Sequence, residues 1–347
     1  MTITIGNTKI GEGKPVFIVA EISCNHLQKK DIALKLIGEA KAAGADAVKF
    51  QTYTPDTITL DVDNEHFRIK GTLWNGRTLY DLYKEAYTPW DWFPELQDRA
   101  KQEGLEFFSS PFDESAVDFL EKLDVSAYKI ASFEINHIPL IKYTARLKKP
   151  IIVSTGVATS ADIELAVQTI RGQKNDQIIL LKCTSAYPAP LNEMNLNTIP
   201  DLAKRFGVIS GLSDHSMNSN VAVAAVAVGA KVVEKHFILD RKLGGPDVEF
   251  SLEPAEFKAM VKAIRETEEA LGEVTYELGE KTKKHLFAMR SIFVAKDMKK
   301  REKFTRENVR VVRPGNGLHP KHYEEILGKV AKKDLKKGTP LEMEMVG

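Results

Sequence analysis

Two histidines stand near the ends of consecutive apolar runs and are the side chains best placed to hold a metal ion. His215 ends the run VISGLSDH, and His236 lies in the next run, KVVEKHF. Adjacent strands lie about 5 Å apart, so imidazoles at the same edge of a sheet can share one divalent cation. Two imidazoles with oxygen ligands suit Mn²⁺, Co²⁺ or Mg²⁺. The alternative is that both rings are hydrogen-bonded structural residues.

Two lysines end further runs of the same kind, together with several hydroxyl side chains. Lys49 lies in AVKFQ and Lys129 in AYKIAS. The hydroxyl side chains are Ser110, Ser132, Ser154 and Ser185. A cationic, hydroxyl-rich surface suits a ligand that carries both a phosphate and a carboxylate. Two alternatives stay open: one lysine pairs with a neighbouring glutamate, or Lys129 forms a Schiff base as in barrel aldolases.

Three carboxylates complete the set of candidates. Glu134 and Asp247 are candidates for general acid–base catalysis, and Asp247 lies in the turn-rich segment GGPDVEFS, as expected of a loop at a site. Glu21 lies near the end of the first apolar run, VFIVAEIS. Because a closed barrel places its first strand beside its eighth, Glu21 is expected within reach of the histidines.

The elements that must position these side chains are eight short β-branched runs, each followed by a helical pattern. The runs are Val16–Ser23, Ala47–Gln51, Leu105–Pro111, Ala127–Ser132, Pro150–Thr155, Gln177–Thr184, Val208–His215 and Lys231–Phe237. Alternation of strands with helices predicts parallel pairing, and apolar runs such as IILL indicate strands buried on both faces. Eight units predict a (β/α)₈ TIM barrel, whose active site lies at the carboxyl ends of the strands. A doubly wound open sheet is the alternative, although no G-x-G-x-x-G follows the first strand.

The second run is followed by an insertion, residues 52–92, that is rich in aromatic side chains. These are Trp74, Tyr80, Tyr83, Tyr87, Trp90 and Trp92. The insertion leaves the carboxyl end of a strand, so it is expected beside the site. The rings either pack the insertion onto the barrel, or one or two of them stack on a sugar or close a lid.

Charge and hydropathy exclude several classes of protein. The 347 residues hold 49 Lys and Arg against 48 Asp and Glu, a net charge of +1, which argues against a nucleic-acid binder. The longest apolar run, Val221–Ala230, is shorter than the roughly 18 residues of a membrane span. Two cysteines and the lack of a signal-peptide pattern predict a cytoplasmic protein with reduced thiols.

The pattern changes after the last long helix, expected over Pro254–Leu271. We predict a barrel domain over residues 1–275, a charged linker over 276–289 and a small β-rich domain over 290–347. Four short strands are expected in the small domain, in SIFVAK, VRVV, KVAKK and PLEM. A domain of this size is close to the lower limit for independent folding, so it is expected to lean on the barrel or on another subunit.

The whole chain resembles the sialic acid synthase family. The motifs that carry the resemblance are, in order, AEISCNH, VKFQTYTP, FFSSPFD, AYKIASFE, IIVSTG, LKCTSAYP, GLSDHS, EKHF and RPGNGLHP. The resemblance implies a metal-dependent condensation of phosphoenolpyruvate with an open-chain amino-sugar aldehyde. It also implies that the tail is an antifreeze-protein-like (SAF) domain.

Within the family, the segment IKGTLWNGRTLYDLYKEAYTPW is similar to one branch. That branch condenses 2,4-diacetamido-2,4,6-trideoxy-altrose with phosphoenolpyruvate, giving pseudaminic acid and phosphate. Such a sugar is less polar than N-acetylmannosamine, which suits an aromatic-rich insertion. The alternatives are the same chemistry leading to sialic or legionaminic acid, the Schiff-base aldolase, and a non-catalytic carbohydrate-binding protein.

The resemblance also implies a role for each site residue. His215 and His236 match the metal ligands. The positions that match phosphoenolpyruvate-binding groups are Lys49, Ser110, Lys129, Ser132, Ser154, Ser185 and Tyr187. Sialic acid synthases have Thr at position 110 and Asn at position 185, so these two contacts differ in reach. The sugar-side groups match Glu21, Gln51, Glu134 and Asp247. Arg313, in RPGNG, matches an arginine that enters the partner subunit's site, which implies a domain-swapped homodimer.

Overall fold

The computed structural model describes residues 1–347, which divide into two compact units, Met1–Gly272 and Glu273–Gly347. The larger unit holds a closed barrel of eight parallel strands in the order β10-β3-β4-β5-β6-β7-β8-β9, so the predicted (β/α)₈ barrel is confirmed. The strands are β3 (Phe17–Glu21), β4 (Ala47–Thr52), β5 (Glu106–Pro111), β6 (Tyr128–Ile130), β7 (Ile151–Ser154), β8 (Ile178–Cys183), β9 (Ile209–Asp214) and β10 (Val232–His236). Seven of them lie within the predicted runs, and β4 extends one residue beyond its run, to Thr52.

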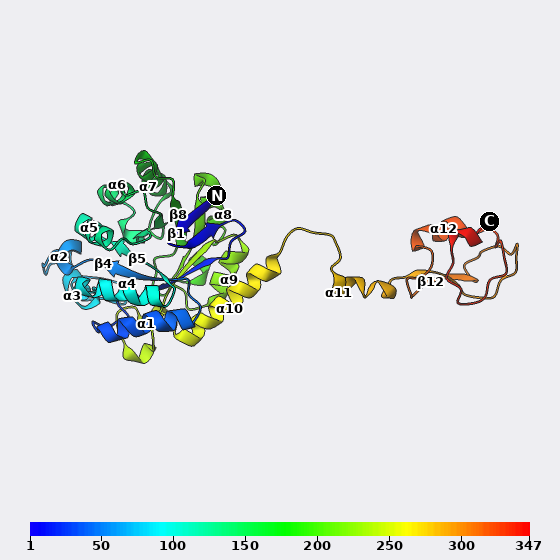
Figure 1. The fold of residues 1–347 in the computed structure, drawn as a ribbon, viewed down its shortest axis with the longest axis horizontal. Helices are drawn as coiled ribbons and strands as arrows, with labels where there is room; N and C mark the ends of the chain where they lie inside the picture. Colours follow the sequence, from blue (N-terminus) through cyan, green and yellow to red (C-terminus); the bar gives the residue numbers. More distant parts are fainter. The chain divides into compact units, whose positions relative to one another are not determined.

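Eight longer helices follow the strands and surround the barrel (Figure 1). They are α1 (Lys30–Ala42), α4 (Phe93–Gln102), α5 (Glu114–Lys122), α6 (Ile138–Ala145), α7 (Ser160–Gly172), α8 (Thr198–Phe206), α9 (Ser219–Ala227) and α10 (Pro254–Leu271). The sequence of α1 explains why this segment forms a helix with one buried face. Its buried side chains recur at helical spacing: Ala33, Leu36, Ile37 and Ala40. Gly44 follows with a φ of +92°, a backbone conformation that stops the helix and favours glycine.

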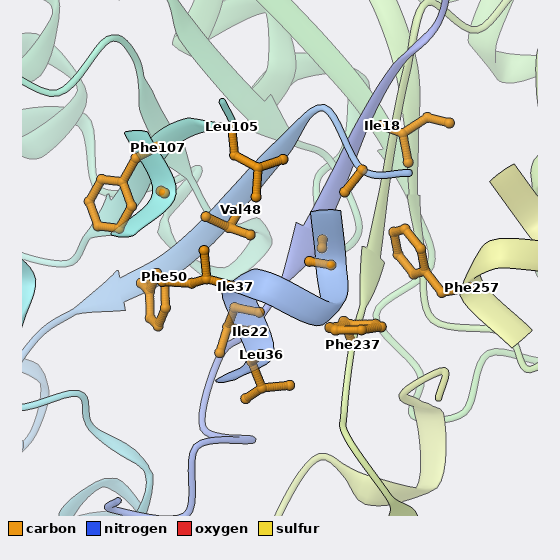
Figure 2. Close-up of a cluster of buried hydrophobic side chains, with 14 of the residues drawn as sticks. Ile18, Ile22, Leu36, Ile37, Val48, Phe50, Leu105, Phe107, Phe237 and Phe257 are labelled. Carbon is orange, nitrogen blue, oxygen red and sulfur yellow. The ribbon is translucent and has the colours of Figure 1, made fainter. Parts of the chain in front are cut away.

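The core between the helices and the outer faces of the strands is apolar and closely packed. Figure 2 shows part of it, where Ile37 of α1 lies beside Val48 and Phe50 of β4. Phe257 of α10 packs in the same cluster, edge-on to Phe237 at 5.2 Å between ring centroids. These buried side chains hold the strand ends in register, which is what the site requires.

A β-hairpin precedes the barrel and closes its amino end. Strands β1 (Thr2–Ile5) and β2 (Thr8–Gly11) pair antiparallel around Gly6 and Asn7. Ile3, Ile5 and Ile10 join the buried cluster formed by inward-facing side chains of the barrel strands. No hairpin is predicted above, although alternating Thr and Ile around a Gly-Asn turn is a recognised hairpin signal. The hairpin leaves only the carboxyl end of the barrel open to ligands.

The insertion contains two short helices, α2 (Pro55–Ile58) and α3 (Leu79–Ala86), and a 3₁₀ turn over Trp90–Trp92. Thr78 caps α3, since its hydroxyl accepts a hydrogen bond from the backbone of Asp81. Only Leu82 of α3 is fully buried. The insertion is therefore built mainly from turns and short elements and rests on the barrel through a few apolar side chains.

The smaller unit has fewer strands than predicted. Strands β11 (Ser291–Val294) and β12 (Val309–Val312) form a two-stranded antiparallel sheet, whereas the segments KVAKK and PLEM make only isolated bridges. The prediction of four strands is wrong because Gly328 and Gly338 turn the chain at positive φ, and Pro340 lacks a backbone N–H for a ladder. The unit still has its own apolar cluster, which includes Ile292, Phe304 and Leu341.

No helix in the chain combines the length and the apolar character that crossing a bilayer requires.

Candidate active site

A cavity of about 430 Å³ opens at the carboxyl ends of the barrel strands. Its charged floor consists of six side chains from the strands: Glu21, Lys49, Lys129, His215, Glu234 and His236. Its roof, which is mostly apolar, consists of side chains from the insertion: Tyr53, Ile58, Ile69, Thr72, Trp74, Leu79, Leu82, Tyr83 and Ala86. The barrel therefore supplies one side of the cavity and the insertion supplies the other.

The two floor lysines share one carboxylate. Lys49 Nζ lies 3.8 Å and Lys129 Nζ 3.6 Å from the same Glu234 oxygen, Oε1. Lys49 also pairs with Glu21 at 2.7 Å, and Ser213 donates a hydrogen bond to Glu234 at 3.1 Å. Both lysines are only 2% exposed, so their ammonium groups are held by protein carboxylates with little solvation. An anionic ligand would meet two oriented cations.

Burial and charge act differently on the protonation of these groups. Burial lowers the pKa of the Lys129 ammonium below its usual range, and the charge of Glu234 offsets only part of this. Burial also opposes the Lys49 cation, but the charges of Glu21 and Glu234 outweigh it and raise the pKa of Lys49. The pKa of Glu234 is lowered, because the two lysine charges outweigh its burial. Burial therefore dominates the pKa of Lys129, whereas the neighbouring carboxylates dominate the pKa of Lys49.

The two histidines lie together, with ring centroids 5.3 Å apart. His215 Nδ1 lies 3.1 Å from the carbonyl oxygen of Thr184; a carbonyl only accepts, so Nδ1 carries the proton and Nε2 keeps its lone pair. His236 Nδ1 is buried without a hydrogen-bond partner, and Asp247 Oδ2 lies 3.5 Å from it. No group of three or more His, Cys, Asp or Glu side chains is arranged to hold a metal. Two imidazoles, one oriented by a carbonyl and one unpartnered, nevertheless fit a cation whose other ligands are water or substrate.

Two further carboxylates face the cavity. Glu134, in the turn after β6, has a buried oxygen, Oε2, with no hydrogen-bond partner. Burial raises its pKa to about 7, and the charges of Lys129 and Lys49 limit the rise. Asp247 is also buried, but the neighbouring His236, Ser23 and Cys24 side chains hold its pKa below the usual range. Of the two, Glu134 is the carboxylate that can take up and release a proton near neutral pH.

The fold brings together eleven of the fourteen predicted site residues. Those that line the cavity are Glu21, Lys49, Gln51, Lys129, Ser132, Glu134, Ser154, Tyr187, His215, His236 and Asp247. Ser110 and Ser185 lie outside the lining: Ser110 accepts a hydrogen bond from Lys49 at 3.3 Å, and Ser185 Oγ is 3.8 Å from Cys183 Sγ. Arg313 lies exposed in the smaller unit.

Two features of the cavity have no counterpart among the predicted site residues. No role is predicted for Glu234, yet it lies between the two lysines. Side chains alternate along a strand, so residues 234 and 236 of β10 share the inner face, and this spacing could have indicated Glu234. Lys235 points the other way and pairs with Asp214 at 3.0 Å. The roof is the second feature, because sequence spacing does not show which insertion residues turn inward.

The aromatic side chains of the insertion divide between the two predicted uses. Trp74 and Tyr83 line the cavity. The Trp74 indole N–H donates to the carbonyl of Pro246 at 3.0 Å, and its ring lies 5.8 Å from that of Tyr187. Trp90, by contrast, stacks on Phe119 at 4.8 Å and serves packing. Trp74 thus connects the insertion to the loop that carries Asp247.

Comparison with known protein families identifies the family to which this chain belongs. The NeuB family matches residues 36–276, and the SAF domain matches residues 289–347. The chain belongs to the NeuB family. The chain is 49% identical to the pseudaminic acid synthase of Campylobacter jejuni subsp. jejuni serotype O:2, over 97% of this chain and 98% of that protein. It is 46% identical to the pseudaminic acid synthase of Helicobacter pylori, over 94% and 97% of the two chains.

A solved NeuB-family relative supports the same fold. The N-acetylneuraminic acid (sialic acid) synthetase of Leptospira borgpetersenii, in complex with citrate, superposes with a TM-score of 0.74 at 34% sequence identity. The match covers 82% of this chain and 95% of that one. As a NeuB-family member, the chain combines a parallel eight-stranded barrel with a carboxyl-terminal SAF domain.

Proposed function

We propose that this chain is a pseudaminic acid synthase, condensing phosphoenolpyruvate and water with 2,4-diacetamido-2,4,6-trideoxy-altrose to give pseudaminic acid and phosphate. The observation that carries the reaction class is the cavity floor, where two buried lysines and two adjacent histidines face one space. The choice of sugar is supported by the 49% identity to the Campylobacter jejuni pseudaminic acid synthase and by the mostly apolar roof.

The floor suits phosphoenolpyruvate in both charge and donors. Lys49 and Lys129 meet its phosphate and carboxylate, and Ser132 and Ser154 offer hydroxyl donors on the same side of the cavity. Ser154 Oγ is buried with no hydrogen-bond partner, so a ligand oxygen would satisfy it. A bound anion would also favour the charged form of Lys129, whose pKa burial has lowered.

His215 and His236 would hold a divalent cation, with Mn²⁺, Co²⁺ and Mg²⁺ as candidates. When bound, such a cation supplies Lewis acidity that polarises a carbonyl group. The hydrogen bond from His215 to Thr184 fixes the ring so that Nε2 is the ligand atom. The aldehyde end of the sugar therefore lies at the histidines in this proposal.

The reaction makes one carbon–carbon bond and breaks one carbon–oxygen bond. C3 of phosphoenolpyruvate attacks the aldehyde carbon, whose oxygen takes up a proton and becomes a hydroxyl. Water then adds at C2 and loses a proton to Glu134. The C2–O bond to phosphate breaks as the new hydroxyl becomes the ketone, and the hydroxyl proton leaves with the phosphate. The raised pKa of Glu134, about 7, suits a base that accepts this proton. In H₂¹⁸O the released phosphate should contain no solvent oxygen; labelled phosphate would contradict this order of bond breaking.

The decisive experiment measures phosphate release from phosphoenolpyruvate by EDTA-treated protein, with and without Mn²⁺. Three sugars are offered separately: the altrose derivative, the legionaminate precursor and N-acetylmannosamine. Release that requires both Mn²⁺ and the altrose derivative is expected. Release with another sugar alone would overturn the sugar assignment, and undiminished release after EDTA treatment would overturn the metal assignment.

A domain-swapped homodimer is a further part of the proposal, with Arg313 of a second copy reaching the sugar. Mixing the inactive variants Arg313→Ala and Lys129→Met should restore about a quarter of wild-type activity, because half the dimers would hold one intact site. No recovery after subunit exchange would show that each chain completes its own site.

A further inference from the structure

The loop that follows β3 has an unusual backbone conformation and no role in the proposed reaction. Its consecutive residues Leu27 and Gln28 have φ values of +53° and +56°. Residues other than glycine rarely adopt this left-handed conformation, and they keep it where surrounding contacts hold them in place. Asn25 and His26, which precede them in the motif AEISCNH, are fully buried. Residues 25–28 do not line the cavity, so they act, if at all, through other residues.

His26 joins this loop to the carboxyl end of the insertion. Its Nδ1 accepts a hydrogen bond from the backbone N–H of Gln28 at 3.1 Å. The proton of the neutral ring is therefore on Nε2, which donates to the Thr88 hydroxyl at 2.9 Å. Burial lowers the pKa of His26 to about 4, so the ring stays neutral near pH 7. Thr88 is fully buried as well, which makes this contact a fixed point of the insertion.

Gln28 contacts the helix that forms part of the roof. Its side-chain amide donates to the backbone carbonyl of Glu85 at 3.3 Å and to that of Tyr87. These carbonyls lie at the carboxyl end of α3, where the last carbonyl groups have no partner within the helix. Four side chains of α3 line the cavity: Leu79, Leu82, Tyr83 and Ala86. A shift of α3 would therefore move this wall of the cavity.

The same loop also contacts the segment that carries Asp247. The Asn25 side-chain amide donates to the carbonyl of Phe237 and to the hydroxyl of Ser251, both at 2.9 Å. The Ser251 hydroxyl donates in turn to the carbonyl of Asp247 at 2.6 Å. The loop is therefore anchored to the barrel on one side and holds α3 on the other.

We infer that His26 and Gln28 are positioning residues, a latch that holds α3 against the barrel and so sets the wall that receives the sugar. The identity of the ligand rests on the proposed function, whereas the contact between the latch and α3 does not. Loss of the latch removes no group from the cavity. It should weaken the binding of the sugar and leave the binding of phosphoenolpyruvate by the floor unchanged.

The first test removes the partner of His26. Thr88→Val keeps the shape of the side chain but leaves the Nε2 proton of His26 without an acceptor. We expect KM for the sugar to rise about fivefold and KM for phosphoenolpyruvate to stay within about twofold of wild type. Thr144→Val is the matched control, because Thr144 is equally buried, does not line the cavity and donates to the carbonyl of Leu140 within α6. It should change neither KM.

The second test separates the latch from the stability of the fold. Gln28→Gly removes the side-chain amide and relieves the left-handed backbone, so a purely structural role predicts a neutral or stabilising change. Limited trypsin digestion, followed by mass spectrometry, measures the opening of α3 without any substrate. Cleavage after Lys84, in α3, should become at least about threefold faster in Gln28→Gly and Thr88→Val. Cleavage after Lys283, in α11 (Glu280–Lys283) of the smaller unit, should keep its wild-type rate.

The outcomes separate this inference from the proposed function. Wild-type cleavage after Lys84 in Gln28→Gly would overturn the latch, and so would an equal rise of KM in Thr88→Val and Thr144→Val. Faster cleavage with an unchanged KM for the sugar would overturn its role in substrate binding. No turnover by the wild-type protein would overturn the proposed function, and the digestion would still decide whether the latch holds α3.

Discussion

The floor and the roof of the cavity are built by different kinds of structure. Each floor side chain projects from a barrel strand or its end, so the parallel register sets its position. The roof belongs to an insertion of short helices and turns, attached to the barrel at one strand end. A barrel can thus keep one reaction while the loops that leave its strands change the molecules that it accepts.

The exposure of the side chains also differs between the floor and the roof of the cavity. Lys49, Lys129 and Glu21 are almost wholly enclosed, whereas Trp74 and Tyr83 keep part of their surface exposed. A charge in the floor is strongly coupled to its neighbours, because little water screens it. Substitutions in the floor should therefore abolish chemistry, and substitutions in the roof should alter substrate preference by smaller factors.

The largest effect is expected at Lys129. Lys129→Met keeps a chain of similar length but removes the cation, so the transition state loses a charge-assisted contact; we expect kcat/KM for phosphoenolpyruvate to fall about 10³-fold. Lys182→Met is the matched control, because Lys182 belongs to β8, does not line the cavity and donates to the carbonyl of Cys183. Steady-state kinetics of the two variants make the comparison.

The same lysine separates the proposed condensation from a Schiff-base aldolase. Borohydride added with both substrates should leave Lys129 unmodified in a mass spectrum of the intact protein. A reduced adduct on that residue would assign it as a nucleophile and contradict its role as an anion-binding group.

The next effect is expected at Glu134 and depends on pH. Glu134→Gln should lower kcat about 10²-fold, because an amide cannot accept the proton of the attacking water. The wild-type rate should rise as pH increases through about 7, where Glu134 loses its proton, and the variant should lack this rise. Persistence of the rise in the variant would assign it to another group.

Stability should depend on pH with the opposite sign. The folded pKa of Glu134, about 7, exceeds the ordinary value of 4.5, so the folded state favours the protonated form. Its contribution to stability is complete below about 4.5 and is lost as pH rises to about 7. Glu134→Gln should match the wild type at pH 4.5 and be more stable by about 1 to 3 kcal/mol at pH 8. Thermal denaturation of the barrel unit at the two pH values measures this difference.

Much of the floor could be predicted from sequence for a physical reason. Eight β-branched runs specify a parallel barrel, and the barrel topology brings strand ends such as Lys49 and His236 to one side without further information. Glu234 could have been predicted from His236, because a residue two positions earlier on the same strand faces the same side. Arg313 belongs to the smaller unit, so the topology of the barrel does not predict its place.

The roof could not be predicted at the same level. The composition of residues 52–92 indicated aromatic packing near the site, but composition does not distinguish Trp74, which lines the cavity, from Trp90, which stacks on Phe119. Which ring turns inward depends on non-local contacts, such as the one from Trp74 to Pro246, which is 172 residues away. The amino-terminal hairpin was missed for another reason: its signal is short and lies outside the repeating strand–helix pattern.

The smallest effect is expected for the link between the roof and the loop that carries Asp247. Trp74→Phe keeps an aromatic ring but removes the indole N–H that donates to Pro246, a hydrogen bond worth about 1 kcal/mol. The loop loses one restraint and the floor is untouched, so KM for the sugar should rise about fivefold with kcat nearly unchanged. Trp92→Phe is the control, because Trp92 packs edge-on to His26 outside the cavity lining. A fall in kcat at constant KM would mean that Trp74 acts on the chemistry of the floor, and the division between floor and roof would then not hold at this position.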